Sequence, residues 1–133
     1  LLLAGGGGRA AARVVPNDNR VAAGRRAGGV LTLALEARVA AWHPEGDAGP
    51  GVDIPAFAEA GRPAQVPGPL VRVPAGTAVH VTLRNTLGDT LTVHGLHDRT
   101  AATARPAAPV VLAPGEARAV RFALDVPGTF YYW

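Results

Sequence analysis

The 133-residue chain contains no cysteine, no serine and no lysine, and each absence excludes a class of function. Without cysteine there is no disulfide framework, no zinc-thiolate site and no thiolate ligand for a blue copper centre. Without serine there is no Ser-His-Asp hydrolase. Because lysine is missing, all 13 basic residues are arginine, beside abundant alanine, glycine and proline. This composition is typical of a GC-rich bacterial genome.

Charge and aromatic content are also low. Thirteen arginines face ten acidic residues, the formal net charge is +3, and Arg25 and Arg26 form the only adjacent basic pair. A nucleic-acid surface needs a basic stripe interleaved with aromatic residues, and aromatics make up only 5% of the chain. We therefore expect no nucleic-acid partner. No apolar run reaches the roughly 20 residues that span a bilayer, so we expect no membrane span.

What the chain does contain is enough apolar material for one compact domain. Hydrophobic residues make up 48%, and 17 glycines and 12 prolines predict many turns between short elements. Residues 1–8 read as leucines and an alanine followed by four glycines. This is typical of the end of a secretory signal peptide, or alternatively of a flexible low-complexity leader. We expect residues 1–29 to be leader and linker, residues 30–133 to be the domain, and the protein to be exported to the periplasm or the cell exterior.

Period-two alternation begins at residue 30 and predicts β-strands. One strand runs to Trp42, and the Gly- and Pro-rich residues 43–69 predict a surface excursion with short pieces of strand. Further strands are expected at residues 70–73 and 79–83, separated by a turn at residues 74–77. Residues 91–94 predict the next strand, with Thr92 and His94 on one face.

The same design continues to the end of the chain. A polar loop at residues 98–109, strands at residues 110–112 and 120–124, and a final strand from Thr129 complete about seven strands. Turns every 8 to 12 residues favour an all-β fold, an antiparallel Greek-key sandwich or barrel. The expected core consists of the inward-facing positions Leu31, Leu33, Leu35, Val79, Val81, Leu83, Val120, Phe122 and Leu124.

Three strings of residues together resemble a known family. They are Pro67-Gly68-Pro69-Leu70-Val71-Arg72-Val73 with the following Gly76-Thr77 and Asn85, then His94-Gly95-Leu96, and finally Pro114-Gly115-Glu116 with Gly128-Thr129-Phe130-Tyr131-Tyr132. Their order and spacing over residues 30–133 resemble the N-terminal plastocyanin-like (cupredoxin) domain of multicopper oxidases, the laccase-like enzymes. The resemblance implies a cupredoxin-like Greek-key β-sandwich or barrel, incomplete at its C-terminal end.

The resemblance also implies copper as cofactor and locates its ligands. The family has two His-x-His pairs. Here His94 falls on the second histidine of the first pair, Thr92 on the first, and Trp133 on the first histidine of the second pair. His97 follows across Gly95, where a bend brings a second imidazole within reach. The predicted metal ligands are therefore His94 and His97, with no catalytic residue. His80 on an outward strand face and His43 in a loop are expected to be structural.

Three functions remain open from the sequence. In the first, the chain is the first cupredoxin domain of an exported multicopper oxidase-like protein, partnered by further cupredoxin domains. By resemblance, the full-length protein oxidises phenols or metal ions and reduces dioxygen, while the fragment alone is not catalytic. In the second, the domain is a copper-free scaffold, which Thr92 and Trp133 favour. The third is a secreted immunoglobulin-like binding module.

Overall fold

The computed structural model describes residues 9–101 and 107–133, and this part of the chain is all-β, as predicted. No helix occurs in these ranges, so none is long and apolar enough to cross a membrane. The strands in the described part are β1 (Val15–Pro16), β2 (Arg25–Ala27), β3 (Val30–Trp42), β4 (Val52–Glu59), β5 (Gln65–Val66), β6 (Thr77–Asn85), β7 (Leu91–Val93), β8 (Val110–Leu112) and β9 (Ala117–Leu124).

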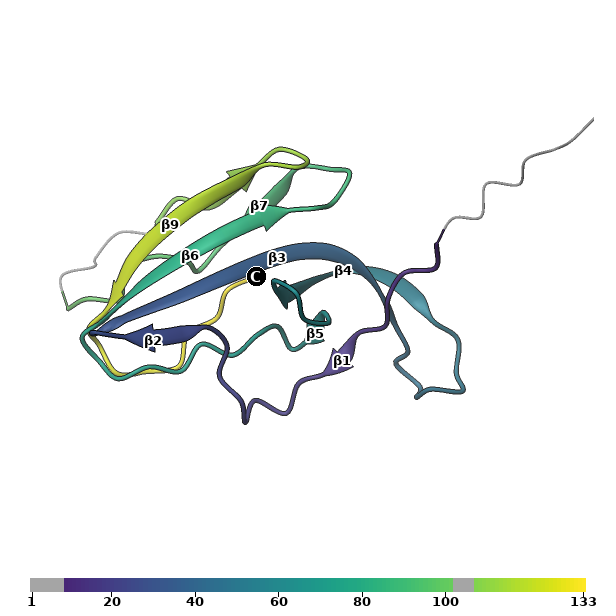
Figure 1. Cartoon of the computed structure of the whole chain (residues 1–133), viewed down its shortest axis with the longest axis horizontal. Helices are drawn as coiled ribbons and strands as arrows, with labels where there is room; N and C mark the ends of the chain where they lie inside the picture. Colours follow the sequence, from purple (N-terminus) through teal and green to yellow (C-terminus); the bar gives the residue numbers. More distant parts are fainter. Residues whose placement is uncertain (1–8, 102–106) are drawn as a thin grey trace, which may run out of the picture.

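Two sheets of unequal size form the two layers. The large sheet has the order β1-β5-β4-β3-β6-β9, with β2 pairing to the start of β3, and β7 pairs with β8 in a second sheet. Figure 1 shows β4, β3, β6 and β9 arranged side by side. The β3–β6 and β1–β5 pairs are parallel, so the expectation of a purely antiparallel sheet is wrong there. The long connection from β5 returns the chain to the start of β3, and β6 therefore enters the sheet in the same direction.

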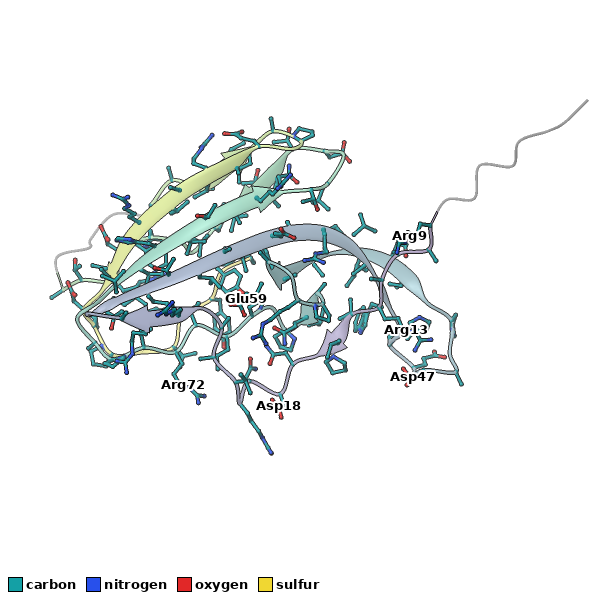
Figure 2. The ribbon with its side chains drawn as sticks, viewed as in Figure 1. Arg9, Arg13, Asp18, Asp47, Glu59 and Arg72 are labelled. Carbon is teal, nitrogen blue, oxygen red and sulfur yellow. The ribbon has the colours of Figure 1, made fainter. Side chains whose placement is uncertain are left out.

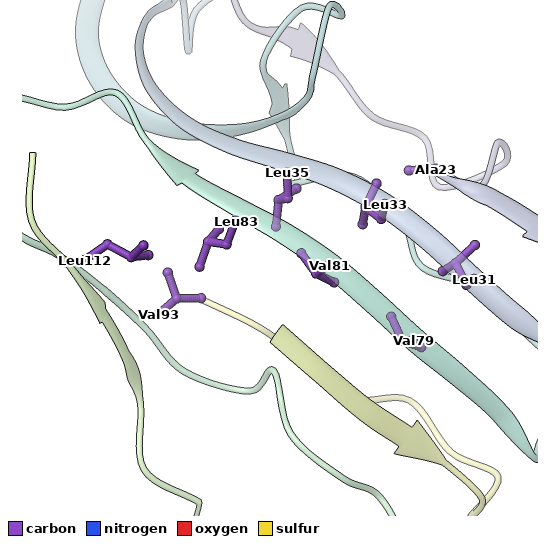
Figure 3. Close-up of a cluster of buried hydrophobic side chains, with 9 residues drawn as sticks. All are labelled: Ala23, Leu31, Leu33, Leu35, Val79, Val81, Leu83, Val93 and Leu112. Carbon is purple, nitrogen blue, oxygen red and sulfur yellow. The ribbon is translucent and has the colours of Figure 1, made fainter. Parts of the chain in front are cut away.

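The main core lies between the two layers. Leucines of β3 and the inward residues of β6 are at most 3% exposed, and β7 and β8 close the core from the other side (Figure 3). Val120, Phe122 and Leu124 of β9 are partly buried against this cluster. The predicted core is therefore confirmed. The buried members are Ala23, Leu31, Leu33, Leu35, Val79, Val81, Leu83, Val93 and Leu112.

A second, smaller core fills the far end of the β3–β4 hairpin. The expectation of short strand pieces in residues 43–69 is wrong, because β4 is eight residues long and pairs with β3 along its whole length. Residues 12–16 cross this end as a strap. Val14 N donates to the Ala41 carbonyl (2.9 Å) and Val15 N to the Ala64 carbonyl (2.8 Å). Small side chains beneath the strap let its backbone approach both β3 and the segment before β5. The buried residues of this second core are Ala40, Ala56, Ala58 and Ala64.

The segment before residue 30, expected to be leader and linker, takes part in this fold from Arg13 onward. Arg13 bridges Ala41, β1 pairs with β5, and β2 pairs with β3. Arg13 also forms an ion pair with Asp47 of the β3–β4 connection (2.8 Å; Figure 2). Residues 1–8, which carry the expected signal segment, lie outside the described residues.

Residues 70–73 were expected to form a strand and do not, apart from an isolated bridge between Leu70 and Ala22. Prolines at both ends, Pro69 and Pro74, lack the backbone N–H that a ladder requires. The alternation is nevertheless meaningful, because Val71 and Val73 both pack against the main core. The following turn is confirmed, with a positive φ of 85° at Gly76 and the Thr77 hydroxyl donating to the Pro74 carbonyl (2.7 Å).

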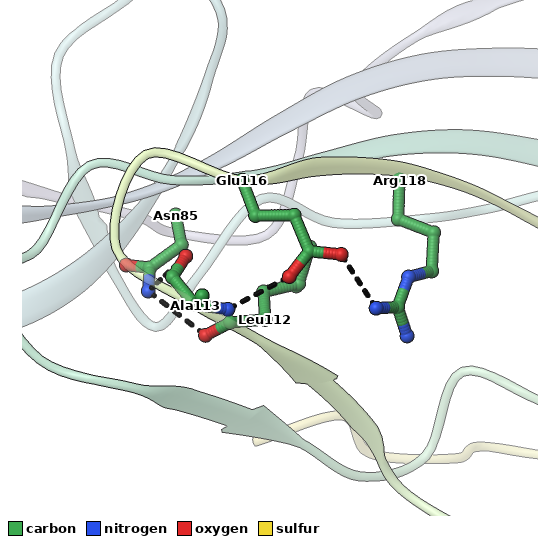
Figure 4. A network of polar contacts seen from close by, with 5 residues as sticks. All are labelled: Asn85, Leu112, Ala113, Glu116 and Arg118. Atoms are coloured by element: carbon green, nitrogen blue, oxygen red, sulfur yellow. Dashed lines mark hydrogen bonds and ion pairs between the residues drawn. The ribbon is translucent and has the colours of Figure 1, made fainter.

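The buried amide of Asn85 joins three chain segments. Its Nδ2 donates to the carbonyls of Asp89 (2.8 Å), Leu112 (3.2 Å) and Ala113 (3.2 Å), and its Oδ1 accepts from Leu87 N (2.9 Å). Figure 4 shows this amide beside the β8–β9 turn. In that turn the Glu116 carboxylate accepts from Ala113 N and pairs with Arg118, and these contacts hold the pKa of Glu116 below its usual value.

The Pro-Gly-Pro string and the C-terminal aromatics form a clasp across the open side of the core. The Tyr132 hydroxyl donates to the Pro69 carbonyl (2.7 Å), and its ring meets Phe57 edge-on at 5.1 Å. A Cβ at Gly68 would lie 2.9 Å from the Tyr132 hydroxyl, so this position requires glycine. Burial raises the pKa of Tyr132 far above the ordinary tyrosine value. The clasp fixes the position of the last residues of the chain.

Truncating the core at Leu83 tests the layer packing. Leu83 is fully buried between the sheets, so Leu83→Ala leaves a cavity and should lower the free energy of unfolding by about 2–5 kcal/mol. Val21, which is 75% exposed, provides the control, because Val21→Ala should change stability by less than about 0.5 kcal/mol. Chemical denaturation measures both. Equal effects of the two substitutions would contradict the described core.

The hydrogen bonds of Asn85 predict that a conservative substitution destabilises the fold more than a truncation does. Asn85→Ala leaves buried carbonyls without a donor and should cost about 1–3 kcal/mol. Asn85→Asp keeps the shape but turns a carboxylate oxygen toward the same carbonyls, so it should be the more destabilising change at neutral pH. Thermal unfolding of both variants gives the order. An aspartate variant as stable as the wild type would show that the amide donates none of these bonds.

The clasp predicts a stability change in alkali. An unperturbed tyrosine ionises near pH 10, whereas folded Tyr132 keeps its proton to higher pH. Above about pH 10 the unfolded state therefore gains stability, and the free energy of unfolding falls by up to about 1.4 kcal/mol per pH unit. Tyr132→Phe should flatten this slope, while Tyr131→Phe, at a 75% exposed position, should not. Urea denaturation across this pH range separates the two variants.

Candidate functional site

The predicted ligand His94 directly follows β7, at the end of the smaller sheet. Val93 points into the main core and is fully buried, whereas Thr92 is exposed and His94 is half-buried. The alternation predicted from the sequence is therefore present, with Thr92 and His94 on the side away from Val93. Among the described residues, no hydrogen bond engages either ring nitrogen of His94.

Trp133 lies directly against His94. Their backbones exchange two hydrogen bonds, His94 N to the Trp133 carbonyl (2.9 Å) and Trp133 N to the His94 carbonyl (3.3 Å). The two rings are stacked, with centroids 5.2 Å apart and planes 11° from parallel. Residues 129–133 do not form the regular strand expected from the sequence, but this pairing sets Trp133 beside His94. The resemblance noted from the sequence predicts a histidine at the position of Trp133.

Gly95 makes this close approach feasible. Its φ is 86°, a conformation that favours glycine, and an added Cβ would lie 2.1 Å from the Tyr131 carbonyl oxygen and 2.8 Å from the Tyr132 Cα. The C-terminal segment therefore passes over the loop after β7 at Gly95, where no side chain blocks the approach. The glycine of the His-Gly-Leu string was expected to permit a bend, and it also serves as the contact surface for the C-terminal segment.

His97 lies in the same loop, with its ring held by its own neighbour. His97 Nδ1 is 3.0 Å from the Asp98 carbonyl oxygen, which can only accept, so Nδ1 carries the proton and Nε2 keeps its lone pair. A histidine in this tautomer can ligate a metal through Nε2. Among the described residues, no hydrogen bond or ring stacking links His97 to His94, and their shared use as ligands stays a prediction.

Arg99 fixes this loop to the large sheet, a role that the sequence analysis did not identify. Its backbone N donates to the Ala123 carbonyl (2.7 Å), and its carbonyl accepts from Asp125 N (2.9 Å) and Val126 N (3.0 Å). Its guanidinium lies over the Phe130 ring, 4.7 Å from the centroid. The Asp98 carboxylate adds a bond from Ala123 N (2.7 Å). In the sequence, the only indication of this role is the position of Arg99 shortly after the His-Gly-Leu string.

The two remaining histidines lie elsewhere. His43 Nδ1 is 3.0 Å from the Gly49 carbonyl, and its ring covers Gly51, where an added Cβ would lie 2.8 Å away. His80 is in β6, between Thr32 of β3 and Arg121 of β9 in the sheet register. His43 therefore stabilises the β3–β4 connection, and His80 lies on the outward face of its strand.

These residues do not make a copper site on their own. Within residues 9–101 and 107–133, no three histidine or acidic side chains lie close enough to hold a metal ion. The place beside His94 is taken by an indole, which offers copper no lone pair, and Thr92 is a poor copper ligand. What the geometry presents is one half-buried imidazole with unengaged nitrogens and a second imidazole of suitable tautomer nearby in sequence.

Comparison with known proteins bears on this arrangement. Residues 61–133, more than half of the chain, match the sequence pattern of the multicopper oxidase family. A multicopper oxidase from Campylobacter jejuni, described as a metallo-oxidase, is similar in structure over 92% of this chain, with a TM-score of 0.57 and 22% identity. A laccase from Pediococcus acidilactici is similar over 92%, with a TM-score of 0.53 and 21% identity. Among curated proteins, none matches this sequence.

The chain spans only about a quarter of these two solved structures, 24% and 27% of their lengths. The structural likeness shows a cupredoxin-like fold, in agreement with the all-β, two-layer arrangement described above. Both the fold and the family expected from the Pro-Gly-Pro and His-Gly-Leu strings are thereby confirmed. This chain belongs to the multicopper oxidase family.

Proposed function

We propose that this chain is the first cupredoxin domain of a larger, exported multicopper oxidase-like protein. The observation that carries the proposal is the pairing of His94 with Trp133, because the two strings that carry copper ligands in the family pattern lie side by side here. The other cupredoxin domains of the same protein are its partners. The full-length protein oxidises phenols or metal ions and couples this oxidation to the reduction of dioxygen.

Within that protein, the contribution of this domain to copper is small. His94 supplies one imidazole, and His97 supplies a second where the partner domain brings the metal within reach. The remaining ligands come from other domains, because the described residues hold no third donor. The chain's own residues position this imidazole: Trp133 stacks on one face of the ring, and Arg99 anchors the loop that follows it.

A second function is favoured by the same indole. If copper is held entirely by other domains, this domain is a copper-free scaffold, and the Trp133 stack closes the place that a ligand would occupy. The scaffold function and the ligand function differ in one respect, namely whether His94 contacts metal in the full-length protein. Membership of the multicopper oxidase family removes the immunoglobulin-like binding module from consideration.

Copper titration of this chain tests whether His94 can bind the metal at all. The chain as given should bind Cu(II) weakly, and His94→Ala should remove most of that binding, whereas His80→Ala, which deletes an imidazole on the outward face, should not. Thr92→His with Trp133→His restores the family's ligand types beside His94. We expect this double variant to bind copper at least about tenfold more tightly, which corresponds to about 1.4 kcal/mol.

The decisive measurement is the copper content of the full-length protein with and without His94→Ala. A loss of copper supports the ligand function, and an unchanged content supports the scaffold. Tight binding by this chain that survives His94→Ala would refute the assignment of His94 altogether.

A further inference from the structure

The outward face of the large sheet carries a row with two arginines and a histidine that the copper proposal does not use. The register aligns Arg25 of β2 with Thr32 of β3, Thr32 with His80 of β6, and His80 with Arg121 of β9. Residues aligned in this way project to the same face of a sheet. The four strands lie next to one another, so the row runs straight across them (Figure 1).

These side chains are accessible, and none of them has an ion-pair partner in the described part of the chain. Arg25, Thr32 and Arg121 are exposed, and His80 is half-buried. None of the five ion pairs among the described residues involves Arg25, His80 or Arg121. The four strands contain a single acid, Glu36, and its carboxylate is already paired with Arg38 (2.9 Å). Among the described residues, no carboxylate therefore forms an ion pair with Arg25 or Arg121.

The rows on either side are small and flat. One contains Ala27, Val30, Ala78 and Ala123, and the other contains Ala34, Thr82 and Ala119. Side chains of this size let a second protein backbone come close to the sheet. Arginine is one of the residue types enriched in protein interfaces. No aromatic side chain stands on these rows to stack with nucleic-acid bases.

We infer that this face docks an acidic protein segment, whose carboxylates pair with Arg25, His80 and Arg121. The row spans three strand spacings of about 4.8 Å, roughly 14 Å, which an extended segment of about four or five residues covers. A second copy docked face to face is disfavoured, because a symmetric contact would oppose one cationic row with the other. The docking face lies on the side of the large sheet opposite the main core, and the inference is independent of the copper proposal.

The probe for this docking face is a fluorescein-labelled short polyglutamate peptide, with binding followed by fluorescence anisotropy. Arg25→Gln with Arg121→Gln lowers the formal net charge from +3 to +1 and should weaken binding about five- to tenfold. The matched control is Arg20→Gln with Arg72→Gln, which removes the same charge from exposed positions outside the sheet and should leave binding within about twofold.

A second variant keeps the test independent of the arginine changes. Thr32→Glu places a carboxylate between Arg25 and His80, and it should weaken peptide binding to a similar extent. Binding should also decline between about 0.01 M and 0.15 M ionic strength, because the Debye length falls from about 30 Å to about 8 Å.

Several outcomes would overturn the inference. Equal losses in the sheet variant and the matched control would show that only net charge matters. Tighter binding of a single-stranded oligonucleotide or of phosphatidylserine vesicles than of the peptide would assign the face to a different class of partner. Concentration-dependent dimerisation abolished by Arg121→Gln would identify the occupant as a second copy.

Discussion

The hydrogen-bonded register of β3 is the constraint on which the rest of this domain depends. This strand is thirteen residues long and pairs with β2, β4 and β6, so it joins nearly every part of the large sheet. Its first half directs Leu31, Leu33 and Leu35 into the main core. In its second half, Ala40 on the opposite face enters the alanine cluster under the strap. A slip of one residue would expose both cores, because side chains alternate between the two faces.

The candidate site depends on this frame through the C-terminal clasp. Tyr132 is held by the Pro69 carbonyl and Phe57, and Gly95 lets the same segment cross close to the loop after β7. Only then does Trp133 reach His94. Most residues of the strings that carry the family resemblance therefore serve packing in this chain. Gly68 and Gly95 allow close approach of the C-terminal segment, and the Pro69 carbonyl accepts the Tyr132 hydroxyl. Asn85 donates to three backbone carbonyls.

Backbone hydrogen bonds hold the fold here, whereas side chains determine whether metal can bind, so the fold can persist when a side chain at a ligand position differs. The bonds that set His94 beside Trp133 are made by backbone atoms, so replacing a side chain at position 133 leaves the register intact. The positions of the metal pattern and the residues that hold those positions are thus separable. A domain of this kind keeps its shape as a building block whether or not it contributes an imidazole to copper.

Local patterns in the sequence were enough to determine the all-β fold, the main core and the turn at Gly76. Period-two alternation and turn residues act over a few positions and need no partner. The family resemblance also assigned Trp133 to a ligand position, and this assignment stays a prediction. What local patterns missed depends on partners distant along the chain. β4 alternates small alanines that look loop-like until β3, the strap and Ala64 enclose them.

The tertiary structure alone decided the remaining features. Residues 70–73 alternate like a strand, yet the flanking prolines leave them with only the isolated bridge from Leu70 to Ala22. The stacking of Trp133 on His94 and the anchoring by Arg99 both need contacts across many residues of sequence. The same holds for the row through Arg25, His80 and Arg121. Each strand's sequence determines which side chains point outward, but only the pairing of the strands aligns them, because register is a property of two strands and not of one.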